Sequence, residues 1–215
     1  MTNEIVIIGG GGHAKVVIDC ITSANKYKIR GIVDNRLTAN EKVMGVPVLG
    51  GDKSIEERID LIDKIYLTVG VGAVRATDNR QAVYGRYKKL GFKFPPIIHG
   101  SAYISEKASY KDGTQVMARA VIGAEVIIGE NVVIYSGCVL EHDCKIASHC
   151  YISPGVIMGG SAEVGENTFV GLGARILQGV KIGRRVTVGA GAVVVNNVED
   201  GKTVAGIPAK EIMHE

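Results

Sequence analysis

The feature that most constrains this 215-residue chain is an uninterrupted six-residue repeat in its second half. Seventeen successive positions at six-residue intervals, from Ile98 to Val194, carry only Ile, Val, Leu, Met or Tyr. The position four residues after each of them carries only Ala, Val, Thr or Cys, from Ala102 to Val198. Two such registers predict a parallel β-helix, in which each hexapeptide forms one short strand and one corner. Both repeated residues are expected to point inward.

The glycine and aromatic contents agree with this prediction. The chain has 29 Gly, only 3 Phe and no Trp, so its core depends on aliphatic and small side chains. Glycine often follows the large residue of a repeat, and we expect these glycines to give the corners their backbone freedom. Four further glycines are consecutive, Gly9 to Gly12.

The first 97 residues have a different pattern. Apolar strand-like runs alternate with helical patterns, which predicts a parallel sheet and a small Rossmann-like α/β domain. The expected strands are 5–8, 29–34, 46–49, 64–69 and 92–97, the last broken by Pro95-Pro96, and the expected helices are 15–23, 54–61 and 76–90. We therefore predict a Rossmann-like domain over 1–97, a β-helix over 98–199 and a C-terminal cap over 200–215.

The glycine run lies between the first strand and the first helix, where Gly9-x-Gly11-x-x-Ala14 matches a dinucleotide-binding fingerprint. Glycines let the backbone approach phosphate, and a helix N-terminus attracts anions. Asp34 ends the next strand, where an acid that binds ribose is expected. NAD and another diphosphate-linked nucleoside, such as a nucleotide-sugar, both remain open, as does a plain tight turn. The lack of a second mononucleotide-binding half disfavours a complete NAD site.

The repeat places His142 and Asp143 at an outward-facing corner, because Leu140 and Cys144 occupy the inward positions. A histidine titrates near neutral pH and can act as a general base, and a neighbouring carboxylate can orient its ring. An exposed histidine on a polar turn is the alternative. Three cysteines, Cys138, Cys144 and Cys150, fall on successive inward positions and are expected to fill the core.

Composition excludes several classes of function. The net charge of +3 and the scattered Lys and Arg residues argue against nucleic-acid binding. No apolar run approaches the ~20 residues of a membrane helix, and the N-terminus lacks the basic region of a signal peptide. The four cysteines are expected to be thiols, and the protein is expected to be cytoplasmic. No metal is expected.

Several motifs together resemble the hexapeptide-repeat sugar acetyltransferases of the sialic-acid O-acetyltransferase type. Within them, the chain is most similar to the N-acetyltransferases of nucleotide-linked 4-amino-4,6-dideoxysugars. The motifs are Gly-Gly-Gly-Gly-His-Ala-Lys-Val-Val-Ile-Asp (9–19), Val69-Gly70 followed by Arg75, Glu-His-Asp-Cys-Lys-Ile (141–146), Ile-Ser-Pro-Gly (152–155) and Ala-Gly-Ile-Pro-Ala-Lys (205–210).

This resemblance implies a left-handed β-helix and a homotrimer with active sites between subunits. The implied reaction transfers the acetyl group of acetyl-CoA to a nucleotide-linked 4-amino-4,6-dideoxysugar, and UDP is the expected nucleotide. The product would serve the synthesis of a surface glycan or glycoprotein. His142 would be the general base and Asp143 would increase its basicity. The residues implied to bind the nucleotide-sugar are Gly11, Gly12, His13, Asp34, Asn35 and Gly70, and those implied to bind acetyl-CoA are Tyr151, Gly160, Leu172 and Ala190. Relatives commonly carry His at the position of Tyr151.

Three other functions remain to be weighed against this one. The first is a sugar O-acetyltransferase of the sialic-acid type, which would use the same machinery on a hydroxyl group. The second is a γ-type carbonic anhydrase, which needs three histidine ligands for zinc, whereas only His142 and His149 lie within the repeats. The third is a non-catalytic protein that binds a nucleotide.

Overall fold

The computed structural model describes residues 3–57, 59–62, 64–76 and 78–212. The chain divides into two compact units, one of residues 1–72 with 79–100 and the other of residues 73–78 with 101–215. The predicted boundary at residue 97 lies close to the end of the first unit. The predicted C-terminal cap belongs to the second unit, and its residues 213–215 lie outside the described part of the chain.

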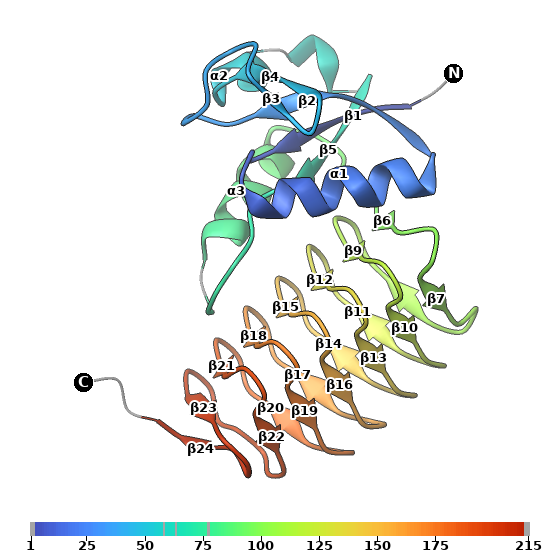
Figure 1. The fold of residues 1–215 in the computed structure, drawn as a ribbon, viewed down its shortest axis with the longest axis vertical. Coiled ribbons are helices and arrows are strands. Elements are labelled where there is room, and N and C mark those ends of the chain that lie inside the picture. The colour runs from blue at the N-terminus through green and yellow to red at the C-terminus, as the bar shows by residue number, and fades with distance from the viewer. Residues whose placement is uncertain (1–2, 58, 63, 77, 213–215) are drawn as a thin grey trace. The chain divides into compact units, whose positions relative to one another are not determined.

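The first unit contains a five-stranded sheet with the order β3-β4-β2-β1-β5 (Figure 1). Its strands are β1 (Asn3–Ile8), β2 (Tyr27–Val33), β3 (Lys42–Val43), β4 (Val46–Gly50) and β5 (Ile65–Val69). Its helices are α1 (Gly12–Ala24), α2 (Lys53–Glu56), a 3-10 turn at Ile59–Leu61, and α3 (Asn79–Lys89). The ladder from β4 to β5 is parallel, as predicted, and β3 pairs with β4 as an antiparallel hairpin that the sequence did not reveal.

Side chains of β1 alternate between the two faces of this sheet, as a strand requires. Val6 and Ile8 belong to a buried cluster with Tyr84 and Tyr87 of α3. Because Ile5 and Ile7 point to the other face and are fully buried, both faces of the central strand lie in the core. This double burial explains why the run Ile-Val-Ile-Ile is apolar throughout.

The strand expected over 92–97 is largely absent. The chain forms only a bridge between Lys93 and Tyr66 and a two-residue strand, β6 (Ile97–Ile98). Pro95 and Pro96 have no backbone N–H to donate to a ladder, which explains why pairing stops there.

The second unit is a parallel β-helix whose strands form three sheets (Figure 1). We name each sheet after its first strand within this unit. The β7 sheet contains β7 (Tyr103–Ile104), β10 (Val121–Ile122), β13 (Val139–Leu140), β16 (Ile157–Met158), β19 (Arg175–Ile176) and β22 (Val193–Val194). The β8 sheet contains β8 (Ser109–Tyr110), β11 (Ile127–Ile128), β14 (Lys145–Ile146), β17 (Glu163–Val164) and β20 (Lys181–Ile182). The β9 sheet contains β9 (Gln115–Val116), β12 (Val133–Ile134), β15 (Tyr151–Ile152), β18 (Phe169–Val170), β21 (Thr187–Val188), β23 (Thr203–Ala205) and β24 (Lys210–Glu211).

The two registers of the repeat point inward, as predicted. From Val116 to Val194 each large residue of the repeat is at most 3% exposed. Tyr110 is different, since 39% of it is exposed, and its strand β8 lies at the end of its sheet, where only one neighbouring coil covers it. Leu140 pairs with Met158, and Tyr151 with Phe169, so equivalent residues of neighbouring coils are 18 positions apart.

The glycines that follow the large residues serve a purpose other than the predicted one. Gly129 and Gly165 do not have a left-handed backbone, so they are not needed for their φ angles. A Cβ at Gly129 would lie 2.6 Å from the backbone nitrogen of Ser148, on the next coil. These glycines therefore let neighbouring coils approach closely. The left-handed corner residues come two positions later and are often not glycine, as at Asn131 (φ 54°) and Asn167 (φ 58°).

Among the described residues, no helix has both the length and the apolar character required to cross a membrane.

Candidate active site

The four-glycine turn joins β1 to α1 in the first unit and leaves open space at its centre. A Cβ at Gly11 or Gly12 would meet no atom within 4 Å, and neither residue has a left-handed φ. Gly11 is the N-cap of α1, and none of the described side chains caps this end of the helix. The backbone N–H groups of a first helical turn lack partners within the helix and attract anions. The turn therefore offers room and backbone donors to a phosphate.

His13 and Gly70 contribute to this turn in different ways. His13 lies in the first turn of α1 and is only 6% exposed, so it is buried at the edge of the turn. Gly70 follows β5, and its N–H donates to the carbonyl of Ile8 at 2.7 Å. A Cβ on Gly70 would overlap the carbonyl oxygen of Gly9, so a glycine here allows the ends of β1 and β5 to meet.

Asp34 fixes the glycine turn from the end of β2. Its Oδ2 accepts a 2.8 Å hydrogen bond from the N–H of Gly10, and its Oδ1 accepts one of 2.8 Å from the N–H of Arg36. Burial alone would raise the pKa of Asp34, but these two N–H groups and the Arg36 guanidinium together hold it below its ordinary value. With 7% of its surface exposed, Asp34 is a charged support of the turn.

Asn35, the other residue predicted to bind the nucleoside, is engaged by Asp52. Its Nδ2 donates to Asp52 Oδ2 at 2.8 Å, and its Oδ1 accepts from the Asp52 N–H at 2.9 Å. Asp52 also accepts from Arg86 at 2.7 Å and from the hydroxyl of Tyr87 at 3.0 Å. Although burial opposes it, these donors lower the pKa of Asp52. The sequence contained no spacing that would have indicated this network, which fixes the Asn35 amide.

His142 and Asp143 project from the corner between the β7 and β8 sheets in the second unit. Their side chains are 57% and 54% exposed, and His142 Nδ1 lies 2.7 Å from Asp143 Oδ2. Asp143 has a left-handed backbone (φ 61°), so its carboxylate turns back toward the preceding ring. When Nδ1 donates to this carboxylate, Nε2 is left as the basic nitrogen of the ring.

The four residues predicted to bind acetyl-CoA lie in three separate places. Gly160 is next to the ring of His142, one coil further along the same corner. Tyr151 is on the β9 sheet, 8% exposed, and stacks on Phe169 with the ring centroids 5.7 Å apart. Leu172 and Ala190 follow one another on the corner between the β9 and β7 sheets. The triangular coil therefore separates Tyr151, Leu172 and Ala190 from His142 within one chain.

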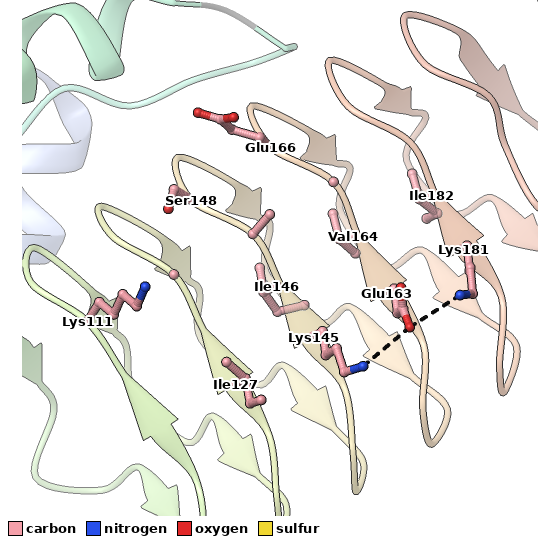
Figure 2. A pocket seen from close by; sticks show the side chains of 13 residues that line it. Lys111, Ile127, Lys145, Ile146, Ser148, Glu163, Val164, Glu166, Lys181 and Ile182 are labelled. Carbon is pink, nitrogen blue, oxygen red and sulfur yellow. Dashed lines mark ion pairs between the residues drawn. The ribbon is translucent and has the colours of Figure 1, made fainter.

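A groove of about 510 Å³ runs along the outer face of the β8 sheet (Figure 2). Lys111, Lys145 and Lys181 line it, and Figure 2 shows Glu163 between the last two. Glu163 forms ion pairs with Lys145 at 3.6 Å and with Lys181 at 3.5 Å. With three lysines against Glu163 and Glu166, the lining of this groove keeps one net positive charge. Exposed pairs of this kind contribute little to stability.

The inward cysteines form part of a hydrogen-bonded ladder. Cys138, Cys144 and Cys150 each donate to a backbone carbonyl 15 residues further on, at 3.1, 3.3 and 3.0 Å. The hydroxyls of Thr114 and Thr168 do the same. Burial raises the pKa of Cys138 and Cys144 to about 11 and that of Cys150 to about 12. As predicted, these thiols fill the core, and they are poor nucleophiles.

The thiols are expected to resist modification in the folded protein. Cys20 is also buried, with its pKa raised to about 12. At pH 8 a disulfide reagent such as DTNB should therefore modify none of the four cysteines before unfolding and all four in denaturant. Absorbance of the released chromophore measures the number. One thiol that reacts rapidly in the native protein would contradict this prediction.

The remaining histidine of the coils, His149, is held by its neighbours. Its Nδ1 lies 3.1 Å from Asn131 Nδ2, and its side chain is 12% exposed. Within the described residues, no group of three or more His, Cys, Asp or Glu side chains could hold a metal ion.

Both units match known protein families. Residues 4–86 match the family described as the PglD N-terminal domain, and residues 111–142, 125–160 and 161–196 match the bacterial transferase hexapeptide repeat. The curated UDP-N-acetylbacillosamine N-acetyltransferase of Bacillus subtilis is 31% identical over 122 residues, which are 54% of this chain and 51% of that protein. The match therefore spans about half of that relative.

Several solved structures match over nearly the whole length of the chain. GDP-perosamine N-acetyltransferase from Caulobacter crescentus, solved as a histidine-to-alanine variant with CoA and GDP-perosamine, is 36% identical. It matches 100% of this chain and 99% of its own, with a TM-score of 0.90. The acetyltransferase domain of PglB from Neisseria gonorrhoeae, in complex with acetyl coenzyme A, is 33% identical over 99% and 100% of the two chains, with a TM-score of 0.89. The chain thus belongs to the family of hexapeptide-repeat sugar N-acetyltransferases that carry a PglD N-terminal domain.

Proposed function

We propose that this protein transfers the acetyl group of acetyl-CoA to the 4-amino group of a nucleotide-linked 4-amino-4,6-dideoxysugar. The observation that carries this proposal is the His142–Asp143 pair on a β-helix, in a chain whose relatives over nearly its whole length were solved with CoA and GDP-perosamine or with acetyl-CoA. The relatives include enzymes for a UDP-linked and a GDP-linked sugar, so UDP remains one of the nucleotides to be tested.

The glycine turn of the first unit binds the nucleotide part of this substrate. Its open space at Gly11 and Gly12 and the N-terminus of α1 suit a diphosphate, with backbone donors from the first turn, including that of His13. Asp34 and Asn35 follow the neighbouring strand, on the side where the nucleoside is expected. Gly70 closes the turn from β5.

His142 acts as the general base in the second unit. The neutral 4-amino group attacks the thioester carbonyl, and Nε2 of His142 accepts the proton that the amine loses. The C–S bond breaks as the amide forms, and the CoA thiolate then takes up a proton. By accepting a hydrogen bond from Nδ1, Asp143 selects the tautomer whose lone pair is on Nε2, and it stabilises the imidazolium that forms. Each acetyl transfer needs no covalent acyl-enzyme, in agreement with the buried thiols.

The active form is a homotrimer. The outward positions of the β7 sheet are mostly apolar, and three of them, Tyr103, Val121 and Ile157, are 63%, 38% and 39% exposed. If the β7 sheets of three copies face a common axis, the His142 corner of one copy meets the Leu172 corner of the next. This arrangement would bring His142 of one copy close to Leu172 and Ala190 of the next, whereas within one chain they lie on different corners.

Replacing Ile157 by Asp should break the trimer, because three carboxylates would be brought to one axis in an apolar contact. Light scattering should give three times the chain mass of 22.8 kDa for the native protein and the single mass for the variant. Ile127→Asp is the control, since Ile127 is also exposed (48%) but lies on the β8 sheet. A monomeric native protein with full activity would overturn the trimer.

The test of the activity is an assay of free thiol release from acetyl-CoA with UDP-, dTDP- and GDP-linked 4-amino-4,6-dideoxysugars. Mass spectrometry should show one acetyl group on the sugar nitrogen. The same nucleotide sugars with a 4-hydroxyl, and free sialic acid, test the O-acetyltransferase alternative, which the relatives do not favour. Turnover with those hydroxyl acceptors alone would replace the proposed function.

A further inference from the structure

The ring of His142 occupies the space that a side chain at position 160 would fill. A Cβ built on Gly160 would lie 2.5 Å from both Cε1 and Nε2 of His142 and 3.1 Å from Cδ2. Gly160 is buried, although it lies on an outward-facing corner. We propose that Gly160 is a positioning residue for His142. Because Gly160 has no side chain, it leaves a space that the imidazole occupies, and we call this space the seat. The inference rests on the proposed role of His142 as the general base.

The backbone does not require glycine at this position. Gly160 lies outside the left-handed region, unlike Gly155 (φ 71°) and Gly179 (φ 71°). The other positions of this column, which recur every 18 residues, all carry side chains, namely Ala124, His142 itself, Gln178 and Asn196. This corner therefore accepts a side chain where no imidazole lies over it.

The corner itself is held in place from both neighbouring coils. The N–H of Ser161 donates to the carbonyl of His142 at 2.8 Å, and the N–H of Gly179 donates to the carbonyl of Gly160 at 2.9 Å. The thiol of Cys144 donates to the carbonyl of Gly159 at 3.3 Å. With the backbone held at these points, a methyl group at position 160 displaces the half-exposed ring and leaves the coil in place.

Two contacts at opposite edges thus orient the imidazole. Asp143 holds Nδ1, and the seat at Gly160 borders Cε1 and Nε2. Loss of the seat moves Nε2, the atom that must meet the amine proton, while the Asp143 contact alone leaves the ring free to swing. A misplacement of about 1 Å at a reacting group can cost 10²-fold in rate.

The first test is a double-mutant cycle of Gly160→Ala and His142→Ala. Gly160→Ala alone should lower kcat by about 10²-fold with the KM for the nucleotide-sugar unchanged. In the His142→Ala background, the same change should alter the residual rate and the CoA affinity by less than twofold, because the ring is gone. Gly85→Ala is the matched control, because a Cβ there meets nothing within 4 Å and φ is not left-handed.

The second test does not depend on catalysis. In protein with ¹⁵N-labelled histidine, the His142 ring signals, identified by their loss in His142→Ala, should shift and change their tautomer balance in Gly160→Ala. If Gly160→Ala lowers kcat equally in both backgrounds, Gly160 acts on acetyl-CoA directly and the inference is wrong. Unchanged His142 ring signals would overturn it as well. Normal turnover of His142→Ala together with shifted signals in Gly160→Ala would instead reject the proposed base while preserving the seat.

Discussion

The His142→Ala variant is expected to lose about 10²- to 10⁴-fold in kcat, the usual contribution of a general base. The amine proton then has no acceptor on the protein in the transition state. Binding should persist, because the proposed nucleotide site is the glycine turn of the first unit. Steady-state kinetics with calorimetry of CoA and nucleotide-sugar binding separates the two effects.

The conservative variant sharpens this prediction. His142→Asn keeps a polar side chain of similar reach but cannot take a proton near neutral pH, so it should be as slow as the alanine variant. His149→Asn is a matched control, since His149 lies on another corner and is 12% exposed. Equal losses in the His149 and His142 variants would indicate damage to the coil and would contradict the assignment of the base.

The Asp34→Ala variant is expected to lower the unfolding free energy of the first unit by about 3 kcal/mol. The change deprives the N–H groups of Gly10 and Arg36 of a buried charged acceptor. Because a loosened turn must be re-ordered on binding, a loss of that size corresponds to about 10²-fold weaker nucleotide-sugar binding. Urea unfolding followed by circular dichroism at 222 nm measures the stability, since all the helices of the described chain lie in the first unit.

The same carboxylate has a defined pH dependence. Because folding lowers the pKa of Asp34 below 3.8, its contribution is complete above the unfolded value and is lost as the pH falls through the lower, folded value. The difference in stability between the native protein and Asp34→Asn should therefore be constant from pH 7 to 5 and shrink below pH 4. Glu57→Ala, which removes an exposed acid of the same unit, should change little at any pH. A difference that grows on acidification would contradict the assignment.

The fold could be predicted from the sequence because the strongest pattern, the six-residue repeat, is also what the stacking of the coils requires. The inward register from Val116 to Val194 has to be apolar for the coils to stack, so its period could be read directly. The run Ile5 to Ile8 is likewise apolar throughout because both faces of β1 are buried, so it could be recognised as a strand. The strand expected at 92–97, with its break at Pro95-Pro96, is reduced further to a bridge at Lys93 and a two-residue strand, because the two prolines have no backbone N–H for a ladder.

The candidate sites were less predictable, since their residues are defined by contacts between distant positions. The His142–Asp143 pair could be found because its members are adjacent in the chain. The support of Asn35 by Asp52, Arg86 and Tyr87 depends on how α3 packs on the sheet, which no local pattern encodes. The role of the glycines that follow the large residues is likewise set between coils, because Gly129 lies close to Ser148 of the next coil.

The in-register stacking of the coils determines which parts of the β-helix unfold first. Each coil contacts only its two neighbours, so unfolding in such an array spreads inward from the ends, as fraying does in other solenoids. The coil that bears His142 lies near the middle of the stack, between β7 and β23. Amide hydrogens around it should therefore exchange with solvent among the last of the β-helix. His142, the proposed base, thus lies at the surface of the protein but on a coil that is expected to open among the last.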